Sequence, residues 1–144
     1  MKKEEFRERH LEHRKSVLRG FLNRTGSENG DCHRAMKDGA IVTCRSLWEL
    51  LGVTMYSKNQ EAQVALMNPP RFGAAISFLE DFSIQPVTEL EFSKFPDKEE
   101  VKKVMIAGNK CVAHIDEYPD HDVTEDILDQ VIKRTLEQIE IRIT

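Results

Sequence analysis

Two side chains that could take part in catalysis lie close together in the stretch GNKCVAHIDE, residues 108–117. A histidine such as His114 can move a proton near neutral pH, and Asn109 could hold its imidazole in position. Two interpretations are open. His114 can act as a general acid or base, or it can be a histidine of a last helical turn that bonds backbone carbonyls or Glu117 and is favoured in its protonated form by the helix dipole.

A helix must position these residues, and we expect it to begin at Asp97 with a capping-box-like pairing to Glu100. On this helix Gly108 falls at the centre of the apolar stripe, with His114 about 120° away on one flank and Asn109 about 100° away on the other. His114 therefore lies at the boundary of the buried face. Gly108 lets another helix approach closely.

The stretch NKCVAHID, residues 109–116, resembles the RN-K-x-x-A-H-x-D stretch of HEPN domains. These are small α-helical bundles of prokaryotic defence and toxin systems. In that family, as here, a long amphipathic helix follows the motif. The resemblance implies metal-independent RNA cleavage, in which a histidine and an arginine serve the 2′-hydroxyl and the scissile phosphate. His114 and Asn109 correspond directly to family positions.

The sequence departs from the family at Gly108, which stands where the family has its arginine. Loss of a well-placed cation costs a rate factor on the order of 10² to 10³. We therefore expect a HEPN-like binding or dimerisation protein of a prokaryotic or phage defence or toxin–antitoxin type system, with little or no catalysis. The resemblance implies a homodimer, with RNA or a protein such as an antitoxin or a nucleotidyltransferase as a possible partner.

The alternative function is a weak metal-independent endoribonuclease. In it His114 would shuttle the proton, Asn109 would position it, and Lys110 would supply the cation. Arginines brought in by folding could take the place of Lys110, and the candidates are Arg34, Arg45 and Arg71.

The sequence gives only weak indications of metal binding, cofactor binding or RNA binding elsewhere in the chain. His10 and His13 share one helical face, and Cys111 and His114 have the same spacing, but each pair supplies only half of a metal site. The sequence has no GxxxxGK[ST], HExxH or CxxC motif, and we expect no metal and no cofactor. The basic face of the first helix could contact RNA, although a solvated face is favoured; its cations are Arg7, Arg14 and Lys15.

Length and composition indicate one domain over residues 1–144, with a net charge of −4 that argues against bulk electrostatic binding to nucleic acid. Basic residues concentrate in the first 24 positions and acidic ones in residues 97–144, so we expect these helices to attract each other. An odd number of cysteines and the lack of a long apolar run predict reduced thiols, no membrane span and a cytoplasmic protein.

The periodicity is helical almost throughout and predicts an all-α, up-and-down, HEPN-like bundle of four to six helices. The first helix should end at Thr25–Gly26, and the second should run from a cap at Asp31 to Gly52 with Trp48 in the core. A short segment, 58–67, has helical composition. For the connector 85–96 a strand pair and a packed loop are both open, and a loop is favoured. The other expected helices cover residues 72–82, 97–115 and 124–143.

Overall fold

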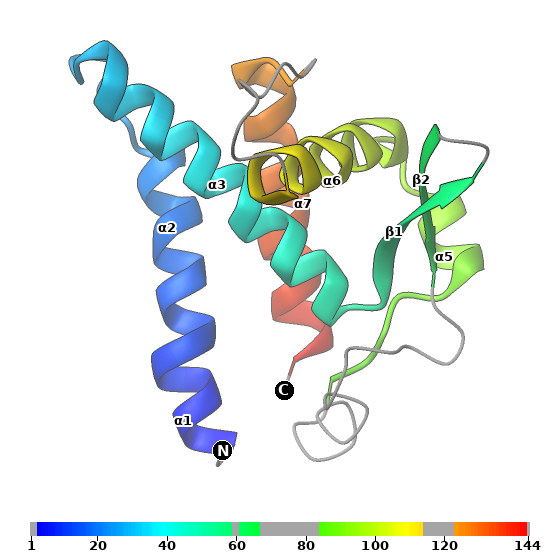
Figure 1. Ribbon diagram of the computed structural model, residues 1–144. Coiled ribbons are helices and arrows are strands. Elements are labelled where there is room, and N and C mark those ends of the chain that lie inside the picture. The colour runs from blue at the N-terminus through cyan, green and yellow to red at the C-terminus, as the bar shows by residue number, and fades with distance from the viewer. Residues whose placement is uncertain (1–2, 59–60, 67–83, 114–122, 144) are drawn as a thin grey trace.

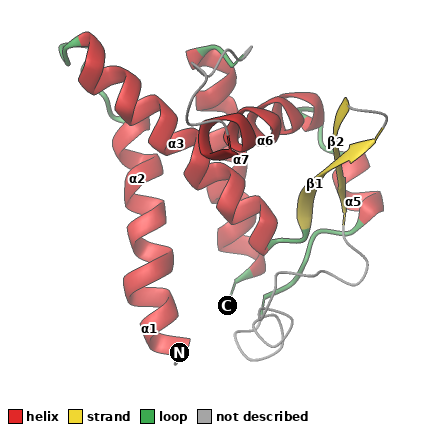
Figure 2. Cartoon of the chain, in the orientation of Figure 1, coloured by secondary structure: helices red, strands yellow, loops and turns green. Residues whose placement is uncertain are grey.

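The computed structural model describes residues 3–58, 61–66, 84–113 and 123–143, and this part of the chain is mostly helical, as predicted (Figures 1 and 2). A two-stranded antiparallel sheet accompanies the helices. In chain order the elements are α1 (Lys3–Glu5), η1 (Phe6–Leu11), α2 (Glu12–Leu22), α3 (Gly30–Leu50), β1 (Val53–Lys58), β2 (Glu61–Leu66), α5 (Glu89–Ser93), α6 (Lys98–Ala113) and α7 (Glu125–Arg142).

The first three elements form one continuous rod, as Figure 1 shows, whose middle part η1 is a π-helix. The rod stops before Gly26, whose φ of 78° is accessible mainly to glycine. The next helix, α3, is capped by Asn29, whose side chain accepts a 2.8 Å hydrogen bond from the Cys32 N–H. The predicted cap at Asp31 is therefore wrong by two residues, because Asp31 already lies inside the first turn. The predicted end is confirmed, since Gly52 has a φ of 96°.

Trp48 of α3 lies at the centre of the core, as predicted. Its side chain is fully buried, and its indole N–H donates a 2.8 Å hydrogen bond to Thr135 Oγ1 of α7. The rings of Phe92 and Phe95 meet it edge-on at 6.2 and 6.1 Å between centroids. One indole therefore joins α3, α7 and the segment around α5.

The last helix begins as predicted, because the Thr124 side chain accepts a hydrogen bond from the Ile127 N–H. Its end is fastened to residues 84–86. The Gln85 N–H donates to the Arg142 carbonyl at 2.8 Å, and the Arg142 guanidinium donates to the carbonyls of Gln85 and Pro86. The C-terminal turn of α7 is thus held by a segment more than fifty residues earlier.

Two connecting segments differ from the predictions. Residues 61–66 form β2, which pairs antiparallel with β1 from Val53↔Leu66 to Lys58↔Glu61. The helical prediction for 58–67 is therefore wrong. The predicted all-α fold class also omits this hairpin. The connector 85–96 contains the short helix α5, which Thr88 and Glu91 start with a reciprocal capping box. The predicted helix at 72–82 lies outside the described residues.

Helix α6 packs against α3, α7 and the hairpin. In the view of Figure 1 it runs across α7, while the rod α1–α2 and the hairpin lie on opposite sides of α3. The motif-bearing helix therefore has its buried face against the centre of the molecule.

Candidate functional site

The C-terminal half of α6 carries the residues singled out from the sequence. Gly108 is buried and Asn109 is half-buried, which agrees with their predicted places on and beside the apolar stripe. Lys110 belongs to the backbone of α6, but its side chain is outside the described part of the structure. His114 also lies outside the described residues.

An arginine from α3 lies against the glycine of the motif. A Cβ atom built on Gly108 would stand 2.9 Å from Arg45 Cβ and 3.0 Å from Arg45 Cδ. These distances are shorter than ordinary carbon–carbon contacts, so any side chain at position 108 would push α3 and α6 apart. The predicted close approach of another helix at Gly108 is confirmed, and that helix is α3.

The charge of Arg45 is opposed by an acid of its own helix. Its Nε donates a 2.8 Å hydrogen bond to Glu49 Oε1, four residues later. The Arg45 side chain keeps about a quarter of its surface exposed, 23%. Folding thus brings one of the three arginine candidates to the motif helix. Of the other two, Arg34 is exposed on α3 and Arg71 lies outside the described residues.

Local sequence patterns could not have selected Arg45 from among the three candidate arginines. Its spacing from Glu49 is typical of an ordinary helical ion pair, and more than sixty residues separate it from the motif. Only the packing of α3 on α6 brings Arg45 and Gly108 together.

Ion pairs join the basic first helix to the acidic end of the chain, as predicted. Lys15 Nζ lies 2.8 Å from Glu140 Oε1, and the Arg24 guanidinium donates two hydrogen bonds to Asp129, at 2.8 and 3.1 Å. Burial lowers the pKa of Lys15, but its hydrogen bonds to Glu140 and Glu12 raise it by more, so the pKa lies above its ordinary value. Part of the basic charge near the N-terminus is therefore paired with acidic side chains of the same protein.

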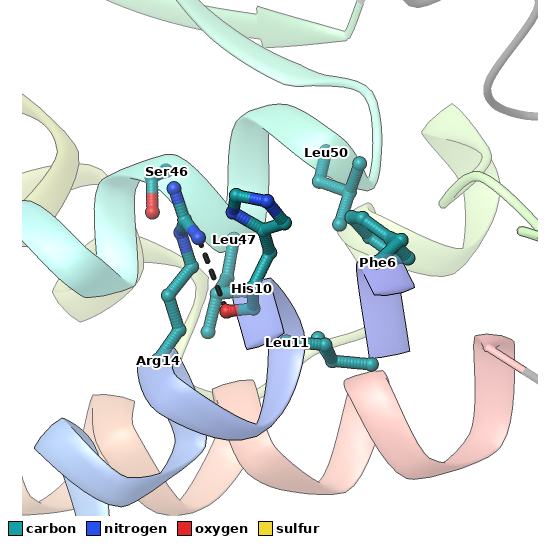
Figure 3. Close-up of a pocket in the computed structure, with 7 residues that line it drawn as sticks. All are labelled: Phe6, His10, Leu11, Arg14, Ser46, Leu47 and Leu50. Carbon is teal, nitrogen blue, oxygen red and sulfur yellow. Dashed lines mark hydrogen bonds between the residues drawn. The ribbon is translucent and has the colours of Figure 1, made fainter. Parts of the chain in front are cut away.

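A pocket of about 210 Å³ lies between the rod and α3 (Figure 3). Arg14 and Ser46 lie at one end of the residues drawn, Phe6 and Leu50 lie at the other, and His10 lies between them. Arg14 donates a 3.1 Å hydrogen bond to the backbone carbonyl of His10. The pocket is completed by Leu11 and Leu47. His10 and Arg14 were both candidates from the sequence, but no pattern in the sequence indicates that they share a cavity.

Within the described ranges, no three side chains of His, Cys, Asp or Glu come together as a bound metal ion would require. Of the histidines on one face of the first helix, which supply only half of a metal site, His10 is half-buried at the pocket and His13 is exposed on α2. In the same part of the chain, no helix is both long and apolar enough to cross a membrane.

Comparisons of the chain with protein-family models, with curated proteins and with solved structures find no match.

Proposed function

We propose that this protein is a HEPN-like helical binding and dimerisation module of a prokaryotic or phage defence or toxin–antitoxin type system, with little or no catalytic activity. Its partner surface would include the motif-bearing end of α6. A second copy of the chain would be one of its partners. RNA, or a protein such as an antitoxin or a nucleotidyltransferase, would be the cellular partner.

The observation that carries the lack of catalysis is the contact between Arg45 and Gly108. The position that holds the family's arginine is filled from outside by the aliphatic part of Arg45, so it has no room for a side chain of its own. The guanidinium of Arg45 is already hydrogen-bonded to Glu49. A phosphate would have to compete with that carboxylate, and much of the electrostatic benefit of the cation would be lost.

A second candidate, the weak metal-independent endoribonuclease, rests on a different feature of the same region, the nearness of an arginine side chain to the motif-bearing helix. Arg45 packs against Gly108 of α6, and Gly108 precedes His114 by six residues. If the Glu49 carboxylate gave way to a phosphate, Arg45 could replace the missing motif cation, with His114 as the proton shuttle and Asn109 holding it. Lys110 is the other cation available to this mechanism.

A cleavage assay separates the two functions. Mixed single-stranded RNA is incubated in EDTA with the parent protein, with His114→Ala and with His13→Ala, whose histidine is exposed on α2 and serves as the control. The binding function predicts no cleavage above background by any of the three proteins. Cleavage that His114→Ala abolishes and His13→Ala retains would replace the binding module with the endoribonuclease.

Association is tested separately, by sedimentation of the parent protein over a wide range of concentrations and by RNA retention on a filter at several salt concentrations. A concentration-dependent dimer, or RNA retention that weakens as salt rises, is expected. A protein that stays monomeric and retains no RNA would contradict the proposal.

A further inference from the structure

We propose that the pocket between the rod and α3 binds a small organic carboxylate whose body is apolar, of about the size of benzoate. This site lies away from Gly108 and does not depend on the proposed function.

The pocket has two chemically different ends, as Figure 3 shows. Phe6 and Leu50 line one end with hydrocarbon, which favours an aliphatic or aromatic body. At the other end, Arg14 presents a planar guanidinium, whose paired N–H groups match the two oxygens of a carboxylate. His10, between the ends, carries at least one ring N–H donor in any protonation state.

The charge of Arg14 favours an anion. Several half-buried or buried cations in the described part of the chain are paired with acids: Lys15 with Glu140, Arg24 with Asp129, Arg134 with Asp97 and Arg142 with Glu91. Within the described residues, Arg14 has no such carboxylate and donates to a backbone carbonyl through one nitrogen. Its remaining N–H groups can therefore serve a ligand that brings its own negative charge.

Ser46 helps to define the ligand. Its hydroxyl already donates a 2.9 Å hydrogen bond to the Thr43 carbonyl, so it offers the pocket acceptor lone pairs rather than its proton. The donors therefore come from Arg14 at the polar end and from His10 between the two ends. Hydrogen-bond donors that share no carboxylate of the protein are better suited to bind a carboxylate ligand than an amine or an alcohol.

The volume limits the size of the ligand. A buried apolar cavity of about 150 Å³ is enough to bind benzene, and this pocket measures about 210 Å³. A single ring or a short branched chain together with one carboxylate fits that space. A nucleotide or a long acyl chain would extend beyond it.

The wall of the pocket includes a π-helix. Phe6, His10 and Leu11 all belong to η1, where the Glu12 N–H donates five residues back, to the Arg7 carbonyl. The wider π turn changes the direction of the side chains that follow it, and such turns are frequent at ligand sites. It brings an aromatic ring, an imidazole and, through α2, a guanidinium to the same cavity.

The test uses sodium benzoate and its neutral analogue benzamide, titrated into ¹⁵N-labelled full-length protein and followed by amide chemical shifts. Saturable shifts with benzoate are expected in residues 6–14 and 46–50, with weaker binding of benzamide. Arg14→Gln should weaken benzoate binding by about tenfold or more, because it removes a charged hydrogen bond. Arg9→Gln is the control, since that side chain is 78% exposed, pairs with Glu5 and does not line the pocket.

Three outcomes would overturn the proposal: shifts that do not saturate or do not map to the pocket, equal affinity for benzoate and benzamide, or equal benzoate affinity in Arg14→Gln and Arg9→Gln. If circular dichroism shows that Arg14→Gln does not fold, Arg14→Lys takes its place. Lysine keeps the charge but loses the two-pronged geometry, so benzoate should bind more weakly but still ahead of benzamide. Unchanged affinity in Arg14→Lys would then contradict the proposal.

Discussion

Gly108 of α6 lies directly beneath the side chain of Arg45 of α3, so closely that an added methyl group would stand 2.9 Å from Arg45 Cβ. The contact joins two helices that are distant in sequence. It also explains why a glycine can stand in the middle of α6 despite its low helix propensity.

Gly108→Ala should therefore lower the free energy of unfolding. Overpacking costs about 1–3 kcal/mol, which exceeds the gain of about 1 kcal/mol in helix propensity. Gly39→Ala in α3 is the matched control, because a Cβ at Gly39 meets nothing within 4 Å, and it should stabilise by up to about 1 kcal/mol. Urea unfolding of both variants measures the difference, and equal stabilisation by both would show that α3 and α6 are not in this contact.

Thr135→Val should destabilise the protein by about 1–3 kcal/mol, because it leaves the buried indole N–H of Trp48 without its acceptor. Thr43→Val is a close control. Thr43, like Thr135, donates from its hydroxyl to the carbonyl four residues earlier, at the same 2.7 Å distance. Trp48 is the only tryptophan, so its fluorescence reports the site as well as the unfolding. Similar losses in both variants would mean that the indole hydrogen bond contributes little.

The stability of the protein should fall in acid partly through Glu91. A hydrogen bond from Arg142, with a second from Thr88, lowers the pKa of Glu91 to about 2 from an ordinary 4.5. A lowered pKa in the folded state means that the contribution is present above pH 4.5 and is lost as the pH falls from 4.5 towards 2. Its size is limited because the Glu91 side chain is 44% exposed.

Glu91→Gln should therefore lose stability at pH 7 and show a flatter dependence between pH 5 and pH 2. The control is Glu89→Gln, which makes the same charge change at an exposed residue of the same helix. Urea midpoints at several pH values compare them. The same acid profile in Glu91→Gln and the parent would exclude this carboxylate as a source of the acid sensitivity.

Lys15→Met should change the free energy of unfolding by no more than about 1 kcal/mol. Methionine replaces the buried stem of a side chain that is only 10% exposed, and the lost ion pairs with Glu140 and Glu12 are offset by the desolvation that is no longer required. Lys15→Ala, which removes the stem as well, should cost about 2 kcal/mol or more. Thermal unfolding compares the two, and a large loss in Lys15→Met would show that the ion pairs dominate.

Two helix ends and the central core were predictable from the sequence because their signals are local. Gly52 ends α3 through its positive φ, and Thr124 caps α7 through its own side chain. Trp48 lies on an apolar stripe that any helical arrangement has to bury.

The hairpin and the Arg45 contact were not predictable because they depend on distant partners. The segment EAQVAL, residues 61–66, consists largely of good helix formers, yet it forms a strand because β1 supplies a full set of backbone partners. The relation of Arg45 to Gly108 likewise depends on how two helices cross. For the site itself, Gly108 and Asn109 lie on α6 as predicted from the sequence, but the sequence could not decide which of the three candidate arginines covers the glycine.

The contacts that hold the last turn of α7 should affect the rate of unfolding. Arg142 contacts Gln85, Pro86 and Glu91, residues 51 to 57 positions earlier in the chain. Such contacts close long loops, and we expect them to form after the folding barrier has been crossed. The stabilisation that these contacts provide then acts mainly on the unfolding rate. We therefore expect the last turn of α7 to slow unfolding and to lengthen the lifetime of the folded state.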